Sequence, residues 1–340
     1  MAQIAIGNTG LFAEQNGFGA LPIQRISKDD AVYLLRKALD GGITYFDSSR
    51  AYTDSEEKLG AAFFGLWDRV IIATKTPSTT TEGFWNDLED SLRLLKTDHI
   101  DIYQFHNTPF CPKPDDGTGL YEAMLKAKEQ GKIRFIGITN HRMFVAREAI
   151  QSGLYDTLQY PFNYLSTPEE FNIVDECRER GIGFIAMKGL SGGLLNDSAV
   201  ACAFIAQYSN VLPIWGIQRE WELDEFLSYT PTPPILNDEM KGRIAKDREM
   251  LQGDFCRACS YCMPCPQGIE INTAARMSLL LRRAPSEGFL SEGGQALMKK
   301  IENCVECGKC ASKCPYGLDT PSLLKRNYKD YLEVLAGKPL

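Results

Sequence analysis

Between residue 17 and about residue 230 the chain alternates short apolar runs with longer amphipathic segments. The amphipathic segments, such as residues 29–42 and 83–96, repeat apolar side chains at helical spacing. Continuous apolar runs separated by helices indicate a parallel sheet that is covered on both faces. The predicted strands are residues 17–23, 43–47, 70–75, 100–106, 133–139, 156–160, 182–188 and 211–216.

Eight strand–helix units over about 200 residues predict an α/β fold of the closed (β/α)8, or TIM-barrel, type. An open doubly wound sheet is the alternative, but no G-x-G-x-x-G motif follows the first strand. The proline-rich stretch 229–239 ends the alternation. We therefore expect a barrel over residues 1–230, a helical linker over 231–252 and a small C-terminal domain over 253–340.

The composition of the chain argues against some classes of function. The chain has 340 residues and a net charge of −7, which argues against a nucleic-acid surface because phosphate binding needs clustered Lys and Arg. No apolar run approaches the ~20 residues that span a bilayer. The first ten residues lack the basic start and apolar core of a signal peptide. We expect a cytoplasmic protein without nucleic-acid or membrane partners.

Eight of the eleven cysteines lie in two runs near the C-terminus, each ending in Cys-Pro. The second run has the C-x2-C-x2-C-x3-C-P spacing by which bacterial ferredoxins hold a [4Fe–4S] cluster, and the first is one residue shorter. The sequence thus predicts two [4Fe–4S] clusters in a ferredoxin-like domain. The predicted ligands are Cys256, Cys259, Cys262, Cys265, Cys304, Cys307, Cys310 and Cys314.

In two-cluster ferredoxins the fourth cysteine of each run ligates the other cluster. This exchange would give Cys314 to the cluster of the first run and Cys265 to that of the second. Zinc is the rival ligand, since paired C-x2-C motifs make tetrahedral sites. Zinc gives no reason for a third cysteine at the same pitch or for two Cys-Pro endings.

Four ionisable or phenolic side chains follow consecutive predicted strands of the barrel. Asp47 ends the second strand and Tyr52 lies shortly after it; Lys75 ends the third strand and His106 the fourth. Barrel chemistry takes place at the C-terminal ends of the strands. A single Lys or His at such a position is more often a structural partner, but four together indicate a reaction site.

The barrel sequence resembles the aldo-keto reductases from residue 7 to about residue 228. The C-terminal part resembles the subset of that family with a ferredoxin-like 4Fe-4S domain. The motifs that carry the barrel resemblance are GGITYFDSSRAY (41–52), ATK (73–75), YQFHN (103–107), GITN (137–140), LQYPFN (158–163) and GLSGGLL (189–195).

The resemblance implies an NAD(P)H-dependent oxidoreductase that reduces an aldehyde or ketone with a tetrad formed by Asp47, Tyr52, Lys75 and His106. Tyr52 would be the general acid, favoured by the neighbouring Lys75 ammonium, which Asp47 holds in place. His106 would donate a hydrogen bond to the substrate carbonyl. A helix-capping tyrosine beside a buried Asp47–Lys75 ion pair is the purely structural alternative.

The resemblance also implies a set of cofactor-binding residues. Two departures from the family matter: Met187 stands where an aromatic usually stacks on the nicotinamide, and Glu222 replaces a basic residue, for which Arg219 could compensate. NADP(H) is the expected cofactor, with NAD(H) left open. The implied residues are Thr139, Asn140, Gln159, Met187, Lys188, Leu190, Gly192, Gly216, Gln218, Arg219 and Glu225.

The two halves of the chain imply different electron chemistry, because hydride transfer moves two electrons together and each cluster takes one. We expect clusters that take part in electron transfer. The alternatives are an ordinary reductase with structural clusters, and a redox-sensing or electron-carrier module that is not an enzyme. Coupling would call for a flavin, for which the sequence holds no motif, or for another species able to split an electron pair. Clusters that are not coupled to the barrel would be structural or served by an external electron carrier.

Overall fold

The computed structural model describes residues 3–251, 255–283 and 286–339. The chain divides into two compact units. Unit 1 comprises Met1–Gly189 and Ser198–Asp238, and unit 2 comprises Leu190–Asp197 and Glu239–Leu340. Residues 190–197 thus group with unit 2, although the sequence analysis assigned them to the barrel. The predicted domain bounds remain predictions.

Unit 1 is built on a closed eight-stranded parallel barrel with the strand order β10-β3-β4-β5-β6-β7-β8-β9. This confirms the predicted TIM barrel, and each predicted strand overlaps an observed one. The strands are β3 (Gly17–Gly19), β4 (Tyr45–Asp47), β5 (Ile71–Thr76), β6 (Ile100–His106), β7 (Ile133–Thr139), β8 (Thr157–Pro161), β9 (Gly183–Met187) and β10 (Val211–Gly216).

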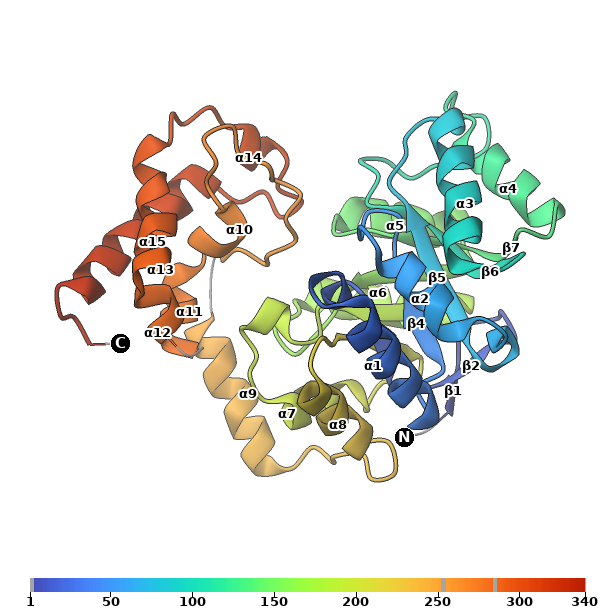
Figure 1. Ribbon diagram of the computed structural model, residues 1–340, viewed down its shortest axis with the longest axis horizontal. Coiled ribbons are helices and arrows are strands. Elements are labelled where there is room, and N and C mark those ends of the chain that lie inside the picture. The colour runs from blue at the N-terminus through green and yellow to red at the C-terminus, as the bar shows by residue number, and fades with distance from the viewer. Residues whose placement is uncertain (1–2, 252–254, 284–285, 340) are drawn as a thin grey trace. The chain divides into compact units, whose positions relative to one another are not determined.

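The helices of unit 1 cover the outside of the barrel, as α3 and α4 do beside β6 and β7 in Figure 1. Because both faces of the sheet are covered, every residue of β5 is buried, including its polar ones. The helices are α1 (Lys28–Asp40), α2 (Ser55–Phe63), α3 (Thr81–Leu95), α4 (Leu120–Glu129), α5 (Met143–Ser152), α6 (Pro168–Arg180), α7 (Ser198–Ile205) and α8 (Glu220–Ser228), with short 3-10 turns at Pro22–Arg25 and Trp67–Arg69.

An N-terminal hairpin, which the sequence analysis did not predict, packs on the core of the barrel. Strand β1 (Gln3–Ala5) pairs antiparallel with β2 (Phe12–Glu14). Their apolar side chains share one buried cluster with residues near the starts of the barrel strands. Its members include Ile4, Ile6, Leu11, Ala13, Tyr45, Ile71, Ala73, Ile102, Ile185, Leu212 and Ile214. The hairpin therefore closes the end of the barrel opposite the C-terminal ends of the strands.

Unit 2 is helical, and no strand occurs among its described residues. Asn327 of the long helix α15 bonds the carbonyl of Ala275 at 3.1 Å and accepts from the N–H of Ser278 at 2.8 Å, which ties α15 to α10 and α11. The elements are α9 (Asp238–Met250), α10 (Ile271–Ala274), α11 (Met277–Arg283), α12 (Glu287–Leu290), α13 (Glu292–Lys299), α14 (Lys309–Ser312) and α15 (Thr320–Leu335), with 3-10 turns at Ser191–Gly193 and Lys300–Asn303 (Figure 1).

Residues 190–197 connect β9 to α7 and are held by arginines of unit 2. Arg276 donates to the Gly192 carbonyl at 2.6 Å, and Arg283 donates to the Leu194 carbonyl at 2.6 Å. Arg283 is itself fixed by a 2.7 Å ion pair with Asp247, in which both side chains are buried. We call residues 190–197 the latched segment.

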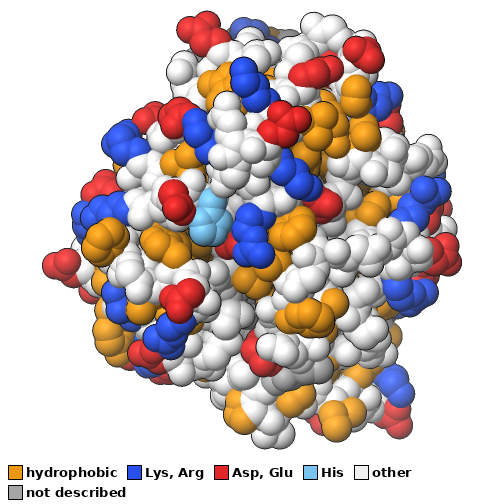
Figure 2. Space-filling model, turned by 90° about the vertical axis from the view of Figure 1, so that its right-hand side faces the viewer, with side chains coloured by type: hydrophobic (Ala, Val, Ile, Leu, Met, Phe, Trp, Pro, Cys, Tyr) orange, Lys and Arg blue, Asp and Glu red, His pale blue; other side chains and the backbone are white. Residues whose placement is uncertain are grey.

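The surface carries mixed charge. On the face shown in Figure 2, Lys and Arg side chains lie among Asp and Glu side chains, with small separate apolar areas between them. None of the helices in the described part of the chain has the length and apolar character needed to cross a membrane.

Candidate active site

The structure brings the four predicted tetrad residues together at the C-terminal ends of β4, β5 and β6. Lys75 Nζ lies 2.7 Å from both carboxylate oxygens of Asp47 and 5.3 Å from the centroid of the Tyr52 ring. The rings of Tyr52 and His106 meet edge to face, with centroids 5.9 Å apart. A phenol, an ammonium and an imidazole therefore share one small volume.

The Asp47–Lys75 pair is buried, with side chains 2% and 0% exposed. The Lys75 ammonium also donates to the carbonyl of Ser48 at 2.5 Å. Burial lowers the pKa of Lys75, while the charge of Asp47 raises it. Burial likewise raises the pKa of Asp47, and Lys75 opposes that shift. Each charge is tolerated there because the other is present.

Ser49 orients His106, a role that the sequence analysis missed. The Ser49 hydroxyl lies 2.8 Å from His106 Nδ1 and accepts the N–H of Ala51 at 3.1 Å. The hydroxyl also lies 3.5 Å from the Lys75 carbonyl, so it either donates to Nδ1 or accepts from it, according to the tautomer of the imidazole. Burial and the positive charge of Lys75 lower the pKa of His106 to about 3. His106 is therefore a neutral hydrogen-bond donor at pH 7.

A second buried carboxylate, which the sequence analysis did not identify, is that of Glu56. Glu56 of α2 is 1% exposed and accepts hydrogen bonds from Thr74 at 2.6 Å and Ser91 at 2.8 Å. Its other oxygen pairs with Arg50 of the loop that carries Tyr52. This pair fixes the loop to α2, and the Glu56 charge also raises the pKa of Lys75. Only tertiary contacts reveal the role of Glu56, since its sequence context is that of an ordinary helix.

Of the predicted cofactor-binding residues, Thr139, Gln159 and Met187 meet at the ends of β7, β8 and β9. The hydroxyl of Thr139 and the amide of Gln159 point at Met187 Sδ over 3.9 Å and 4.0 Å. The other contact of the Gln159 amide nitrogen is 3.5 Å to Asp47. All three contacts are long, so both donors can bind a polar ligand group.

Asn140 and Lys188 have structural contacts in the same region. The Asn140 amide donates to the Thr108 carbonyl at 2.8 Å, and its oxygen accepts from the Arg142 N–H at 2.9 Å. Lys188 has a left-handed backbone, with φ of 61°, and its carbonyl accepts from Asn163 at 2.9 Å. These bonds shape the strand ends around Thr139 and Met187.

The residues predicted for the adenosine end lie after β10. Glu222 accepts the N–H groups of Gln218 and Arg219 at 2.9 Å and 3.0 Å and pairs with the Arg219 guanidinium at 3.2 Å. Gly216 ends β10. Glu225 instead accepts hydrogen bonds from Ser198 and Tyr229.

Leu190 and Gly192 belong to the latched segment, which groups with unit 2. Gly192 has a left-handed backbone, with φ of 66°, and a Cβ there would lie 3.2 Å from Arg276 Nη1. Glycine therefore allows the arginine to pack against the main chain.

The two cysteine runs of unit 2 approach each other. A single pocket is lined by Cys262 and Cys265 of the first run together with Cys304, Cys307 and Cys310 of the second. Burial and the neighbouring thiols of Cys304 and Cys265 raise the pKa of Cys310. Burial and the thiols of Cys256 and Cys259 raise the pKa of Cys262 to about 12. Cys262 also neighbours Cys310, so these contacts bring the two runs together without dividing the thiols between two clusters, and the ligand sets remain predictions.

The side chains that the two runs share as possible metal ligands are all thiols, and cysteine thiolates are the ligands that hold iron–sulfur clusters. Within residues 3–251, 255–283 and 286–339, no three His, Cys, Asp or Glu side chains converge as they would around one metal ion. A four-iron cluster spreads its cysteine ligands over the corners of a cube, more widely than a single ion does. The other cysteines, Cys111, Cys177 and Cys202, are buried.

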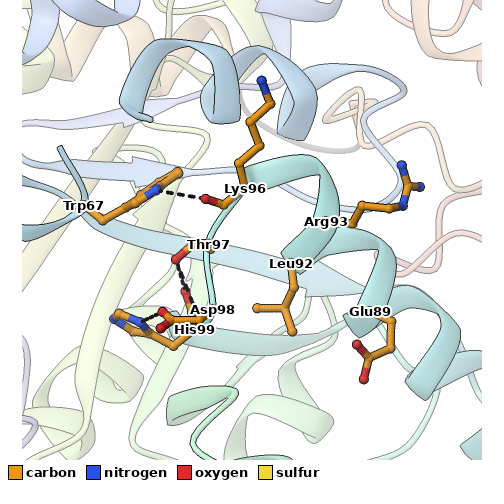
Figure 3. A pocket seen from close by; sticks show the side chains of 8 residues that line it. All are labelled: Trp67, Glu89, Leu92, Arg93, Lys96, Thr97, Asp98 and His99. Carbon is orange, nitrogen blue, oxygen red and sulfur yellow. Dashed lines mark hydrogen bonds and ion pairs between the residues drawn. The ribbon is translucent and has the colours of Figure 1, made fainter. Parts of the chain in front are cut away.

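A separate open pocket of about 700 Å³ lies near the start of β6. Figure 3 shows its lining, in which Trp67 donates to the Lys96 carbonyl at 3.2 Å and His99 Nδ1 lies 2.7 Å from Asp98. His99 directly precedes β6 and His106 ends it. The pocket is therefore at the opposite end of the barrel from the tetrad.

The fold of unit 1 is a closed eight-stranded parallel barrel, and family comparison assigns the class of protein. The model described as the aldo/keto reductase family matches residues 13–201, more than half of the sequence, so the chain belongs to the aldo/keto reductase family. A second model, a 4Fe-4S dicluster domain, matches residues 255–319.

Two curated relatives show the extent of the similarity. L-galactose dehydrogenase of Arabidopsis thaliana is 31% identical over 213 residues, which cover 57% of this chain and 66% of that protein. Aldo-keto reductase YhdN of Bacillus subtilis is 29% identical over 215 residues, covering 57% and 64%. The matched region thus spans just under two thirds of each relative.

Solved structures share the fold at lower identity. An aldo-keto reductase from Bacillus halodurans, in its holo form, has a TM-score of 0.63 at 21% identity and covers 73% of this chain and 96% of its own. An aldo-keto reductase from Klebsiella pneumoniae in complex with NADPH has a TM-score of 0.61 at 22% identity, covering 72% and 95%.

Proposed function

We propose that this protein is a cytoplasmic, NADP(H)-dependent reductase of aldehydes or ketones whose two [4Fe–4S] clusters exchange electrons with the barrel site. The observation that carries the proposal is the convergence of Tyr52, the Asp47–Lys75 pair and His106 at one end of the barrel. Family membership supports it.

The tetrad residues would each act differently on the carbonyl oxygen of the substrate. Tyr52 Oη donates the proton, and the buried Lys75 ammonium next to its ring stabilises the phenolate that remains. His106 Nε2 donates a hydrogen bond to the same oxygen and stabilises its developing negative charge. Asp47 keeps Lys75 charged and in place, and a Ser49 hydroxyl that donates to Nδ1 would keep the His106 proton on Nε2.

The strand ends around Met187 fit the amide end of a nicotinamide. Thr139 and Gln159 offer donors that make only long contacts within the chain, and a carboxamide provides the acceptor they lack. When bound, the nicotinamide supplies a hydride to the substrate carbon. Arg219, with a guanidinium 58% exposed beside Glu222, would bind a 2′-phosphate, which favours NADP(H) over NAD(H).

Anaerobically purified protein should oxidise NADPH in the presence of members of an aldehyde and ketone panel and form the corresponding alcohols. The measurement follows NADPH absorbance and product together, with NADH in parallel to test the cofactor preference. Turnover of no carbonyl while NADPH still binds would contradict the reductase and favour the redox-sensing alternative.

The two proposed clusters are supported by the eight thiols of the cysteine runs and by the match to a 4Fe-4S dicluster domain. The predicted holders are Cys256, Cys259, Cys262 and Cys314 for one cluster and Cys304, Cys307, Cys310 and Cys265 for the other. A cluster, when bound, supplies one-electron transfer, so two clusters match the two electrons of one hydride.

Adding NADPH without substrate under argon should bleach the visible absorbance of the clusters and produce a reduced-cluster EPR signal. Dithionite sets the full amplitude, and the Tyr52→Phe variant serves as a control that keeps the cysteines. An unchanged spectrum with NADPH, where dithionite still reduces the clusters, would mean that they are structural or served by an external carrier. A bleached spectrum would call for flavin analysis of the same sample.

A further inference from the structure

Tyr52 lies in the loop between β4 and α2, and this loop makes two further contacts with the tetrad. The Ser48 carbonyl accepts from the Lys75 ammonium at 2.5 Å, and the Ser49 hydroxyl lies 2.8 Å from His106 Nδ1. The position of the loop relative to β5 and β6 therefore sets the geometry of the whole tetrad.

Arg50, in the middle of this loop, is anchored in two ways. Its main-chain N–H donates to the Lys75 carbonyl at 3.0 Å. Its guanidinium pairs with Glu56 of α2, and the two side chains are 20% and 1% exposed. Because water screens this pair little, breaking it should disturb the loop more than breaking an exposed pair would.

Glu56 is itself fixed in place by the barrel. One of its carboxylate oxygens accepts hydrogen bonds from Thr74 Oγ1 at 2.6 Å and from Ser91 Oγ at 2.8 Å, and the other pairs with Arg50. Thr74 directly precedes Lys75 in β5, and Ser91 belongs to α3. The carboxylate is therefore fixed against the strand that carries the lysine, and through the guanidinium it ties the loop to that strand.

The main chain next to Tyr52 has a conformation that the loop would not keep by itself. Thr53 has a left-handed backbone, with φ of 39°, which is unfavourable for a β-branched residue. Such a conformation persists where the surrounding contacts impose it. The hydrogen bonds of the Thr53 hydroxyl are long and exposed, at 3.2 Å and 3.3 Å, so the buried Arg50–Glu56 pair contributes more to holding the loop.

We propose that Glu56 is a positioning residue: through Arg50 it holds the Tyr52 hydroxyl where it donates a proton to the substrate oxygen. This inference rests on the proposed reduction of a carbonyl. Glu56 acts on the reaction through the tyrosine and not by touching the substrate. A displacement of about 1 Å at a reacting group can cost about 10²-fold in rate, so a loosened loop should be visible in kcat.

Glu56→Gln keeps the size of the side chain and removes the charge that binds Arg50. In the intact, cluster-loaded chain it should lower kcat for carbonyl reduction about 10- to 100-fold, while the Kd for NADP⁺ stays unchanged. Single-turnover kinetics and calorimetry measure the two quantities. Glu57→Gln is the matched control, because Glu57 is the next residue of α2 and its 2.7 Å pair with Lys28 is exposed.

A double-mutant cycle with Tyr52→Phe tests whether the effect passes through the tyrosine. In the Tyr52→Phe background, Glu56→Gln should lower kcat no further, because the proton that it positions is already lost. A general loss of structure would instead lower kcat by the same factor in both backgrounds. That additive result would overturn the proposal.

Arg50→Gln separates positioning from a direct effect of the Glu56 charge, which raises the pKa of Lys75. This variant keeps the carboxylate and breaks its tie to the loop. The proposal predicts a fall in kcat similar to that of Glu56→Gln, and wild-type kcat in Arg50→Gln would overturn it. The same measurement decides the question if Glu56→Gln does not fold.

Arg50→Lys keeps a cation at the carboxylate and should retain more of the wild-type kcat than Arg50→Gln does. Equal kcat in these two variants would contradict an ion pair as the tie. A wild-type chain that reduces no carbonyl would reject the proposed function. An active wild-type chain whose kcat Glu56→Gln leaves intact would reject the Glu56 inference alone.

Discussion

Replacing Tyr52 by Phe should lower kcat for carbonyl reduction about 10²- to 10⁴-fold, the usual contribution of a positioned general acid. The ring keeps its edge-to-face contact with His106 and its place near Lys75, and only the donated proton is lost. The affinity for NADPH should not change, because the strand-end donors Thr139 and Gln159 are untouched. Single-turnover kinetics with the best substrate of the panel measure the chemical step directly.

The pH profile gives a further check on the same assignment. The pKa of His106 is about 3, so the imidazole stays neutral above pH 5 and adds no step to the profile between pH 5 and 8. A step in that range that disappears in His106→Gln would contradict the neutral-donor role. If the Tyr52→Phe variant reduced carbonyls at a rate close to that of the wild type, Tyr52 would not be the general acid, whatever the pH profile showed.

Lys75→Met should destabilise the barrel by about 3–5 kcal/mol, since it leaves the Asp47 carboxylate buried without its counter-charge. The Asp47→Asn/Lys75→Met double variant should recover much of that loss, because no buried charge remains. All four tryptophans lie in the barrel, so urea unfolding followed by tryptophan fluorescence reports on unit 1 alone. Lys28→Met, which breaks the exposed pair with Glu57, is the control and should change little.

The loss of stability caused by Lys75→Met should also depend on pH. Without Lys75 the pKa of Asp47 rises further above the value near 3.9 of an unfolded aspartate, so the unfolded chain binds fewer protons than the folded one at neutral pH. Stability of the variant should therefore fall as pH rises above about 4 and approach the wild-type value below it. A deficit independent of pH would mean that lost packing, rather than the carboxylate charge, is the cause.

The sequence predicted the barrel because its strands are buried on both faces and stand out as apolar runs. It did not predict the β1–β2 hairpin, since strands of three residues carry too little pattern. The convergence of Asp47, Tyr52, Lys75 and His106 was predictable because each of them lies at or near the end of a strand. Ser49 and Glu56 were not, because their roles depend on partners, His106 and Arg50, that only the folded chain brings close.

The latched segment shows a different limit of sequence-based prediction. Its LSGG stretch was assigned to the barrel by resemblance, and nothing local indicates that it groups with unit 2. The contacts that hold it come from Arg276 and Arg283, more than 80 positions along the chain, and such pairings leave no trace in periodicity.

The same segment has a consequence for biosynthesis. The last residue of unit 1, Asp238, leaves the ribosome 45 residues before Arg283, which donates to the Leu194 carbonyl. At elongation rates of about 5–20 residues per second, the nascent barrel spends roughly 2–9 s with residues 190–197 unanchored. We therefore expect chains stalled at residue 238 to expose this connection to proteases, and full-length chains to protect it once the iron–sulfur domain has folded.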